Sequence, residues 1–182
     1  MAIKTFTTGE VLTASDTNTY LANSGLVYVT SATVGSGVSS VTVSNCFSST
    51  YDNYRIVFAG INCSNVDWYL LKINGSSGAT YSFGGTYGTY SSSAVNGKNG
   101  VNFSAWQPAV TATTTADFVI DINRPFLTTV TTFNSQGANS GYWSLVTGYD
   151  SNAASSTGLI VSPNVGTITG GTITIYGYRK GS

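Results

Sequence analysis

Apolar and polar residues alternate along most of this chain, which is the pattern of half-buried β-strands. Phe118, Ile120 and Ile122 fall on one face of a strand, while Asp117 and Asp121 fall on the other. The alternating stretches are separated by turns rich in Gly, Asn and Ser, with no helical pattern between them. We expect strands over residues 26–34, 38–45, 54–61, 66–73, 101–106, 118–122, 128–133, 142–149, 158–161 and 172–178.

Short strands at regular spacing, joined by such turns, predict an all-β fold. We therefore predict an antiparallel β-sandwich, jelly-roll-like, over residues 26–182. A chain of 182 residues is long enough to bury one sizeable core and leaves little for a second domain.

Residues 1–25 differ from the rest, and we expect them to form an arm and a short helix. Thr13 and Asp16 have the spacing of a capping box, and Gly25 supplies a C-terminal stop, which places the helix over Ala14 to Ser24. A helix of this length is not stable alone in water. Its apolar side chains must therefore pack on the β body or on another copy of the chain.

A stretch rich in Tyr, Gly and Ser covers residues 81–93 and predicts a long loop, which is either functional or mobile. Tyrosines in such a loop offer large contact area at little entropic cost, and their rings stack on sugars. We therefore take Tyr81, Tyr87, Tyr90 and the following Asn96 as candidate ligand contacts. The alternative is that these tyrosines pack across sheet edges or subunit contacts.

Charged residues make up only 8% of the chain, with seven basic and seven acidic side chains. A nucleic-acid binder concentrates Lys and Arg in one place, and this chain does not, so we expect no nucleic-acid partner. We expect no signal peptide, because residues 1–25 hold no apolar core, and no membrane insertion, because no stretch is long enough to span a bilayer. A surface with so few charges favours self-association, and we expect a homotrimer.

The side chains needed for most catalytic chemistry are missing from this sequence, and we expect no enzyme activity. No histidine occurs, which removes His-based triads and imidazole metal ligands. Asp117 and Asp121 share a strand face but lie about 13 Å apart, beyond the range of about 5–9.5 Å for a glycosidase pair.

We expect no metal and no cofactor. Asn62, Asn65 and Asp67 could offer oxygen ligands to calcium, but turns explain them without an ion. Cys46 and Cys63 are interpreted as unlinked, partly buried thiols of a protein made in a reducing cytoplasm. A disulfide between neighbouring strands is the alternative.

Residues 6–21 read F-T-T-G-E-V-L-T-A-S-D-T-N-T-Y-L. This segment resembles the start of many small structural proteins of tailed bacteriophages, in which F-x-x-G-x-V-L-T-A-x-D-x-N-x-Y-L precedes a β-rich body. Residues 47–56 and 171–179 also look like that group, whereas roughly residues 62–165 do not.

The resemblance implies a virion surface protein, made in the host cytoplasm, that serves as a tail fibre, tail-tip or capsid decoration component. Such proteins are often homotrimers in which the N-terminal segment binds other virion proteins or forms trimer contacts. The residues expected to make these contacts are Phe6, Val11, Leu12, Tyr20 and Leu21. The alternative function is a host-recognition module that binds a cell-surface glycan through the Tyr/Ser/Gly-rich loops.

Overall fold

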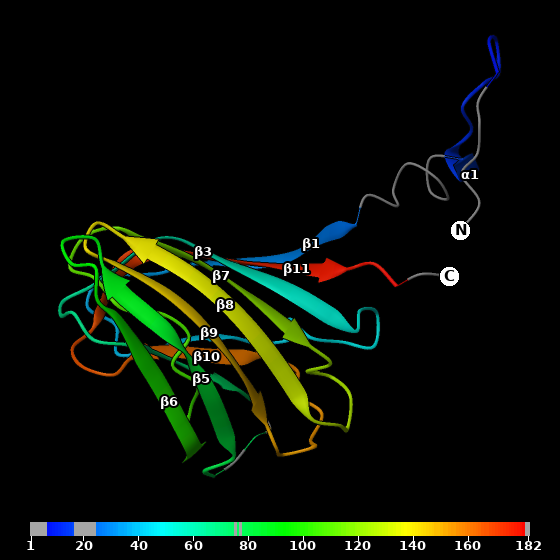
Figure 1. Ribbon diagram of the computed structural model, residues 1–182. Helices are drawn as coiled ribbons and strands as arrows, with labels where there is room; N and C mark the ends of the chain where they lie inside the picture. Colours follow the sequence, from blue (N-terminus) through cyan, green and yellow to red (C-terminus); the bar gives the residue numbers. More distant parts are fainter. Residues whose placement is uncertain (1–6, 17–24, 75, 77, 181–182) are drawn as a thin grey trace.

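The computed structural model describes residues 7–16, 25–74, 76 and 78–180. These residues form two antiparallel sheets that pack face to face, so the predicted β-sandwich is confirmed (Figure 1). The strands are β1 (Leu26–Thr33), β2 (Val41–Val43), β3 (Asn53–Cys63), β4 (Tyr69–Ile73), β5 (Tyr81–Thr89), β6 (Val95–Phe103), β7 (Ala116–Asn123), β8 (Thr131–Asn139), β9 (Tyr142–Asp150), β10 (Leu159–Pro163) and β11 (Ile168–Tyr178).

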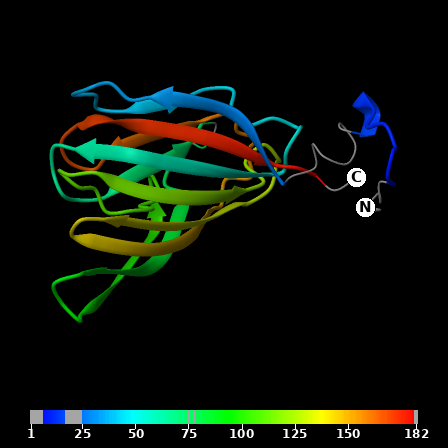
Figure 2. The same ribbon diagram turned by 90° about the horizontal axis from the view of Figure 1, so that it is seen from above.

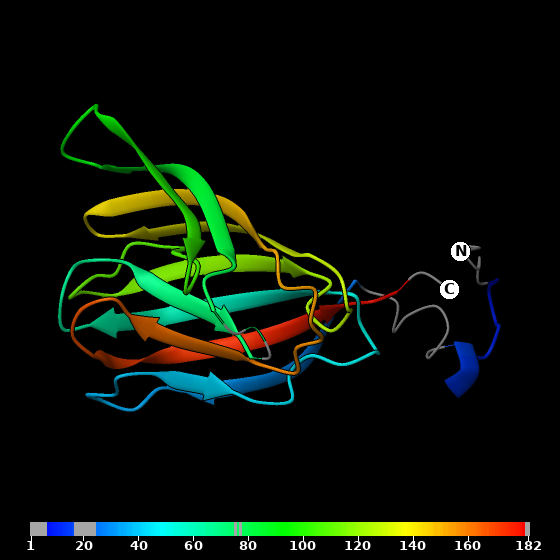
Figure 3. The same ribbon diagram turned by 90° about the horizontal axis from the view of Figure 1, so that it is seen from below.

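The two sheets are unequal in size. The large sheet has eight strands in the order β1-β11-β3-β7-β8-β9-β5-β6, and the small sheet has three in the order β2-β10-β4. The chain alternates between the sheets from β1 to β5 and crosses again at β10 and β11, which is the jelly-roll-like feature of the fold. The β5–β6 hairpin projects from one end of the sandwich (Figures 2 and 3).

Inward-facing side chains of both sheets form one hydrophobic core. Phe58 on β3 pairs in register with Phe118 on β7, and the two rings stack with their centroids 4.0 Å apart. Tyr69 on β4 packs on Phe118 from the small sheet at 4.9 Å. Ile120 and Ile122, which follow Phe118 on the same face, have no exposed surface. The alternation seen in the sequence thus identified the core face of β7.

Residues 105–112 form an irregular segment that is buried from end to end. Trp106 and Leu71 exchange two backbone hydrogen bonds of 3.0 Å, which joins this segment to the free edge of β4. On its other side, the Ser135 hydroxyl on β8 donates to the Pro108 carbonyl at 2.7 Å. The segment therefore widens the small sheet and covers part of the inner face of the large one.

The expectation of a long loop over residues 81–93 is wrong. Most of this stretch is strand β5, which pairs with β9 and β6. Its glycines permit close approach between strands rather than a turn. A Cβ atom on Gly85 would collide with the Leu145 carbonyl of β9, and one on Gly88 would collide with the Trp143 ring. The strand expected over residues 101–106 likewise ends at Phe103, where β6 ends.

The N-terminal helix begins where the capping box predicts, as α1 (Ala14–Asp16). The Asp16 amide donates to Thr13 Oγ1 at 3.1 Å, and the Thr13 amide donates to Asp16 Oδ2 at 3.1 Å. The remainder of the expected helix, residues 17–24, lies outside the described residues.

Candidate functional site

Tyr81 is a core residue, so the expectation that it contacts a ligand is wrong. Its side chain is fully buried, and its ring meets Trp106 edge-on at 5.0 Å. The hydroxyl donates to the Ile73 carbonyl at 3.3 Å and accepts from the Ile73 amide at 3.1 Å. Burial raises the pKa of Tyr81 to about 12. The residue links β5 to the end of β4 and is closed to solvent.

The other three candidate ligand contacts lie on or near the β5–β6 hairpin. Tyr87 is half-buried and meets Trp68 edge-on at 5.3 Å, which matches the alternative that these tyrosines are packing residues. Asn96 pairs in register with Tyr87 and is exposed. Tyr90, at the turn, is 60% exposed. Of the four candidates, Tyr90 and Asn96 are therefore the exposed ones.

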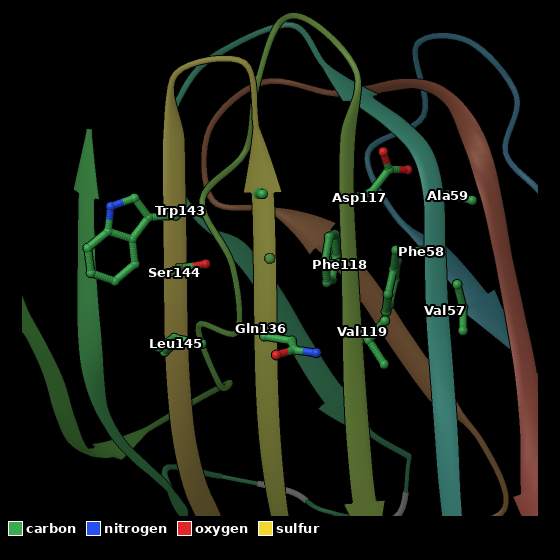
Figure 4. Close-up of a pocket in the computed structure, with 12 residues that line it drawn as sticks. Val57, Phe58, Ala59, Asp117, Phe118, Val119, Gln136, Trp143, Ser144 and Leu145 are labelled. Carbon is green, nitrogen blue, oxygen red and sulfur yellow. The ribbon is translucent and has the colours of Figure 1, made fainter. Parts of the chain in front are cut away.

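The outer face of the large sheet holds a depression of about 460 Å³ that the sequence did not indicate (Figure 4). Strand register explains its shape. Asp117 on β7, Ala138 on β8 and Trp143 on β9 lie side by side in one row across the sheet. The small Ala138 side chain leaves a hollow between two larger neighbours. Asp117 and Trp143 stand about 10 Å apart at its two sides, because neighbouring strands are spaced by about 4.8 Å.

In the next row along the strands, two apolar side chains flank one polar side chain. It consists of Val119, Gln136 and Leu145, again paired in register. Gln136 is exposed, and its side chain makes no hydrogen bond within the described residues. Leu145 is 51% exposed. We call the depression and these two rows of residues the outer-face site.

Trp143 lies flat on the sheet at the rim of the outer-face site. A Cβ atom on Gly88, its register partner on β5, would lie 2.8 Å from Nε1, 2.9 Å from Cε2 and 2.9 Å from Cζ2 of the indole. Near-equal distances to three consecutive ring atoms mean that one face of the ring rests on Gly88. The opposite face is turned outward, as Figure 4 shows. Glycine at position 88 is what allows the ring to lie this close to the sheet.

The charges on this face are arranged so that only one borders the depression. Asp117 is the one ionisable residue among those that line it, and its Oδ1 accepts a hydrogen bond from the Gly60 amide at 2.8 Å. Farther along the same face, Asp121 is paired with Arg55 at 2.7 Å. The hydrogen bonds from Arg55 hold the pKa of the Asp121 carboxyl below its usual value. The outer-face site therefore carries a local negative charge and no cation.

The described part of the N-terminal segment, residues 7–16, stands apart from the sandwich in all three views (Figures 1 to 3). Within it, Val11 is 79% exposed and Leu12 is 47% exposed. The other residues expected to make attachment contacts, Phe6, Tyr20 and Leu21, lie outside the described residues. These two neighbouring side chains therefore present apolar surface to water.

The remaining candidates for chemistry are engaged in the fold, except that the buried Asn62 Oδ1 has no hydrogen-bond partner among the described residues. Both cysteines are free and buried, as interpreted from the sequence, and the alternative disulfide is not formed. Burial raises the pKa of the Cys46 thiol to about 12, which disfavours the reactive thiolate. Asn65 Oδ1 accepts from the Ser64 hydroxyl, and Asp67 Oδ2 accepts from the Asn164 amide at 2.8 Å. Within the described part of the chain, no three Cys, Asp or Glu residues are grouped as metal ligands.

Sequence reasoning missed the outer-face site because it depends on the pairing of β7, β8 and β9. One local signal was present: β9 carries bulky residues on both faces. Its inward residues include Val146, while Trp143, Leu145 and Tyr149 alternate with them on the outer face. An outward run of this kind is unusual for a strand whose outer face meets only solvent.

Comparison with protein-family models, with curated proteins and with solved structures finds no match to this chain. Among the described residues, no helix has the length and apolar character that a membrane crossing requires.

Proposed function

We propose that this chain is a virion structural protein of a tailed bacteriophage, a binding and assembly module without enzyme activity. In this proposal the sandwich is displayed on the particle surface as a tail-fibre, tail-tip or capsid decoration component. The N-terminal segment attaches it to another virion protein. The observation that carries the proposal is the exposure of Val11 and Leu12 next to a formed capping box.

The physical reasoning starts from this exposure. Val11 and Leu12 gain free energy only when they leave water, by about 25 cal/mol for each Å² of apolar surface buried. Thr13 and Asp16 already fix the start of a helix beside them, so less entropy is lost when the segment docks. The opening sequence motif, which resembles phage structural proteins, covers the same residues.

The test is incorporation of the full-length protein into phage particles. A Val11→Asp, Leu12→Asp double variant should fold normally and be absent from purified virions. Val66→Asp is the matched control, because Val66 is an exposed valine of the sandwich at 49% exposure. If the double variant copurifies with particles as well as the control does, the attachment proposal fails.

The alternative function, glycan recognition, needs a different site from the one expected. Tyr81 is buried and Tyr87 packs on Trp68, so the tyrosine-rich segment does not form the expected binding loop. What favours a ligand-binding role is the outer-face site, in which an indole face is turned outward and a carboxylate and an amide lie on the same face of the sheet.

A further inference from the structure

We propose that the outer-face site binds a neutral saccharide, with Trp143 as the platform on which a sugar ring stacks. This inference goes beyond attachment to a particle, and it does not depend on the N-terminal segment.

Trp143 provides the stacking surface. Its inner face is fixed against Gly88, and its outer face is open. The face of an aromatic ring carries partial negative charge, and it attracts the polarised C–H groups on one side of a pyranose. A ring already held flat on a sheet loses little entropy when a ligand stacks on it. The geometry therefore fits a flat ligand that is apolar on one side.

Two polar groups lie on the same outer face as Trp143, one and two strands away from it, where a ligand of several sugar rings extends. Asp117 lies in the Trp143 row, beyond Ala138, and Gln136 lies in the next row. The Gly60 amide holds the Asp117 carboxylate in place and leaves it able to accept further hydrogen bonds. The Gln136 amide both donates and accepts and makes no hydrogen bond within the described residues. Carboxylate and amide groups suit hydroxyl ligands.

These polar groups also argue against a purely apolar occupant. An apolar peptide laid over Ala138 and Leu145 would bury the Asp117 carboxylate and the Gln136 amide without replacing their water. Burying a polar group in this way costs free energy, and burying a charged group costs more. A saccharide satisfies both groups while its C–H face covers the indole.

The charge at the site selects among saccharides. The residues that line the depression include one carboxylate and no Lys or Arg. The nearest cation of this face, Arg55, is held by Asp121 through two hydrogen bonds. A sialylated, sulfated or phosphorylated glycan would bring a second negative charge close to Asp117 without a cation to balance it. We therefore assign the site to uncharged hexose-containing glycans.

The chain supplies its own reporter for the test. Trp68 is 8% exposed and Trp106 is fully buried, so Trp143 is the tryptophan that a surface ligand reaches. The full-length protein is titrated with tetrasaccharides of glucose, mannose, galactose and N-acetylglucosamine, and with an acidic galacturonic acid tetrasaccharide. Tryptophan emission and isothermal titration calorimetry are recorded together.

We expect at least one neutral tetrasaccharide to bind and to change the emission. Trp143→Ala should weaken that binding by about tenfold or more, the equivalent of one lost stacking contact. Gln136→Ala should weaken it by a smaller factor. Tyr90→Ala, which removes an exposed aromatic ring elsewhere, is the matched control and should leave the affinity unchanged.

Four results would overturn the proposal. One is that none of the neutral tetrasaccharides binds at millimolar concentration. Another is that Trp143→Ala, with an unchanged circular dichroism spectrum, binds as tightly as the native protein. The third is that the acidic tetrasaccharide binds best. The fourth is that Trp143→Ala changes the oligomeric state in sedimentation, which would mean that another copy of the chain covers this face. All four use purified protein and are independent of virion incorporation.

Discussion

Asp121 on β7 accepts two parallel hydrogen bonds from Arg55 on β3, from Nε at 2.8 Å and from Nη2 at 2.7 Å. Tyr178 on β11 donates a third to Asp121 Oδ1 at 2.7 Å. These three strands are neighbours in the large sheet, although they come from the start, middle and end of the sandwich sequence. The cluster therefore fastens together segments that are far apart along the chain.

The cluster predicts a pH-dependent contribution to stability. Arg55 lowers the pKa of Asp121 in the native state, so the contribution is fully present above the ordinary Asp pKa of about 3.9. It is lost as the pH falls through the lower native value. Because 37% and 30% of the Arg55 and Asp121 side chains are exposed, solvent screens the pair. We expect Asp121→Asn to lower the unfolding free energy by about 1 kcal/mol at pH 7.

Urea denaturation at several pH values measures this effect. The difference between native protein and Asp121→Asn should shrink below about pH 4. Asp52→Asn is the control, because it removes the more exposed Asp52–Lys180 ion pair and should cost less. A difference that stays constant from neutral to strongly acidic pH would contradict the linkage.

Substitutions in the core and in the β5–β6 hairpin should lower the unfolding free energy by different amounts. Ile120 has no exposed surface, so Ile120→Ala leaves a cavity and should lower the unfolding free energy by about 2–5 kcal/mol. Tyr87 packs on Trp68 rather than lying in a loop, so Tyr87→Ala should cost about 1–2 kcal/mol. Equal losses in denaturant titrations would mean that the hairpin belongs to the main core.

Both thiols should be unreactive in the native protein. Cys46 and Cys63 are free and buried, and the Cys46 pKa of about 12 leaves almost no thiolate near neutral pH. An aromatic disulfide reagent at pH 8 should detect no thiol in the folded chain and both after denaturation. Rapid modification of the native protein would show that this end of the sandwich opens readily.

The sequence predicted the fold where side-chain alternation was local and strong. Phe118, Ile120 and Ile122 identified the core face of β7 without knowledge of its neighbours. Prediction failed for β5, where Gly85 and Gly88 were assigned to a loop. The absence of a side chain at these two positions lets β5 lie close to Leu145 and Trp143, which are distant in sequence.

The outer-face site was missed for the same physical reason. Asp117 and Trp143 lie in one row on either side of Ala138 only because β7, β8 and β9 pair in one particular register. A shift of one residue in either pairing would turn one of them to the other face. Local patterns define which residues share a strand face, whereas a site built across strands depends on pairings between distant segments.

We predict that the protein is a homotrimer in solution. Val101 and Phe103 on the edge strand β6 are 67% and 44% exposed, which adds apolar surface to a chain with few charges. Sedimentation equilibrium of the full-length protein at micromolar concentration should give three times the chain mass. A double Val101→Lys, Phe103→Lys variant should shift the population toward monomer if this edge contributes. A stable monomer for the native protein would contradict the prediction.

The position of Trp143 should depend on the absence of a side chain at residue 88. A Cβ atom there would lie 2.8–2.9 Å from three indole atoms, closer than carbon atoms approach in proteins, so Gly88→Ala must lift the ring from the sheet. The neighbour that has to move is a side chain rather than backbone, so we expect a loss of only about 1–2 kcal/mol in stability. Acrylamide should then quench the tryptophan emission more strongly, because both faces of the ring meet solvent.

Gly84→Ala on the same strand is the control, since a Cβ atom there meets nothing within 4 Å, and it should change neither stability nor quenching. If Gly88→Ala leaves acrylamide quenching unchanged, the ring is not held by that contact, and the preformed platform loses its physical basis.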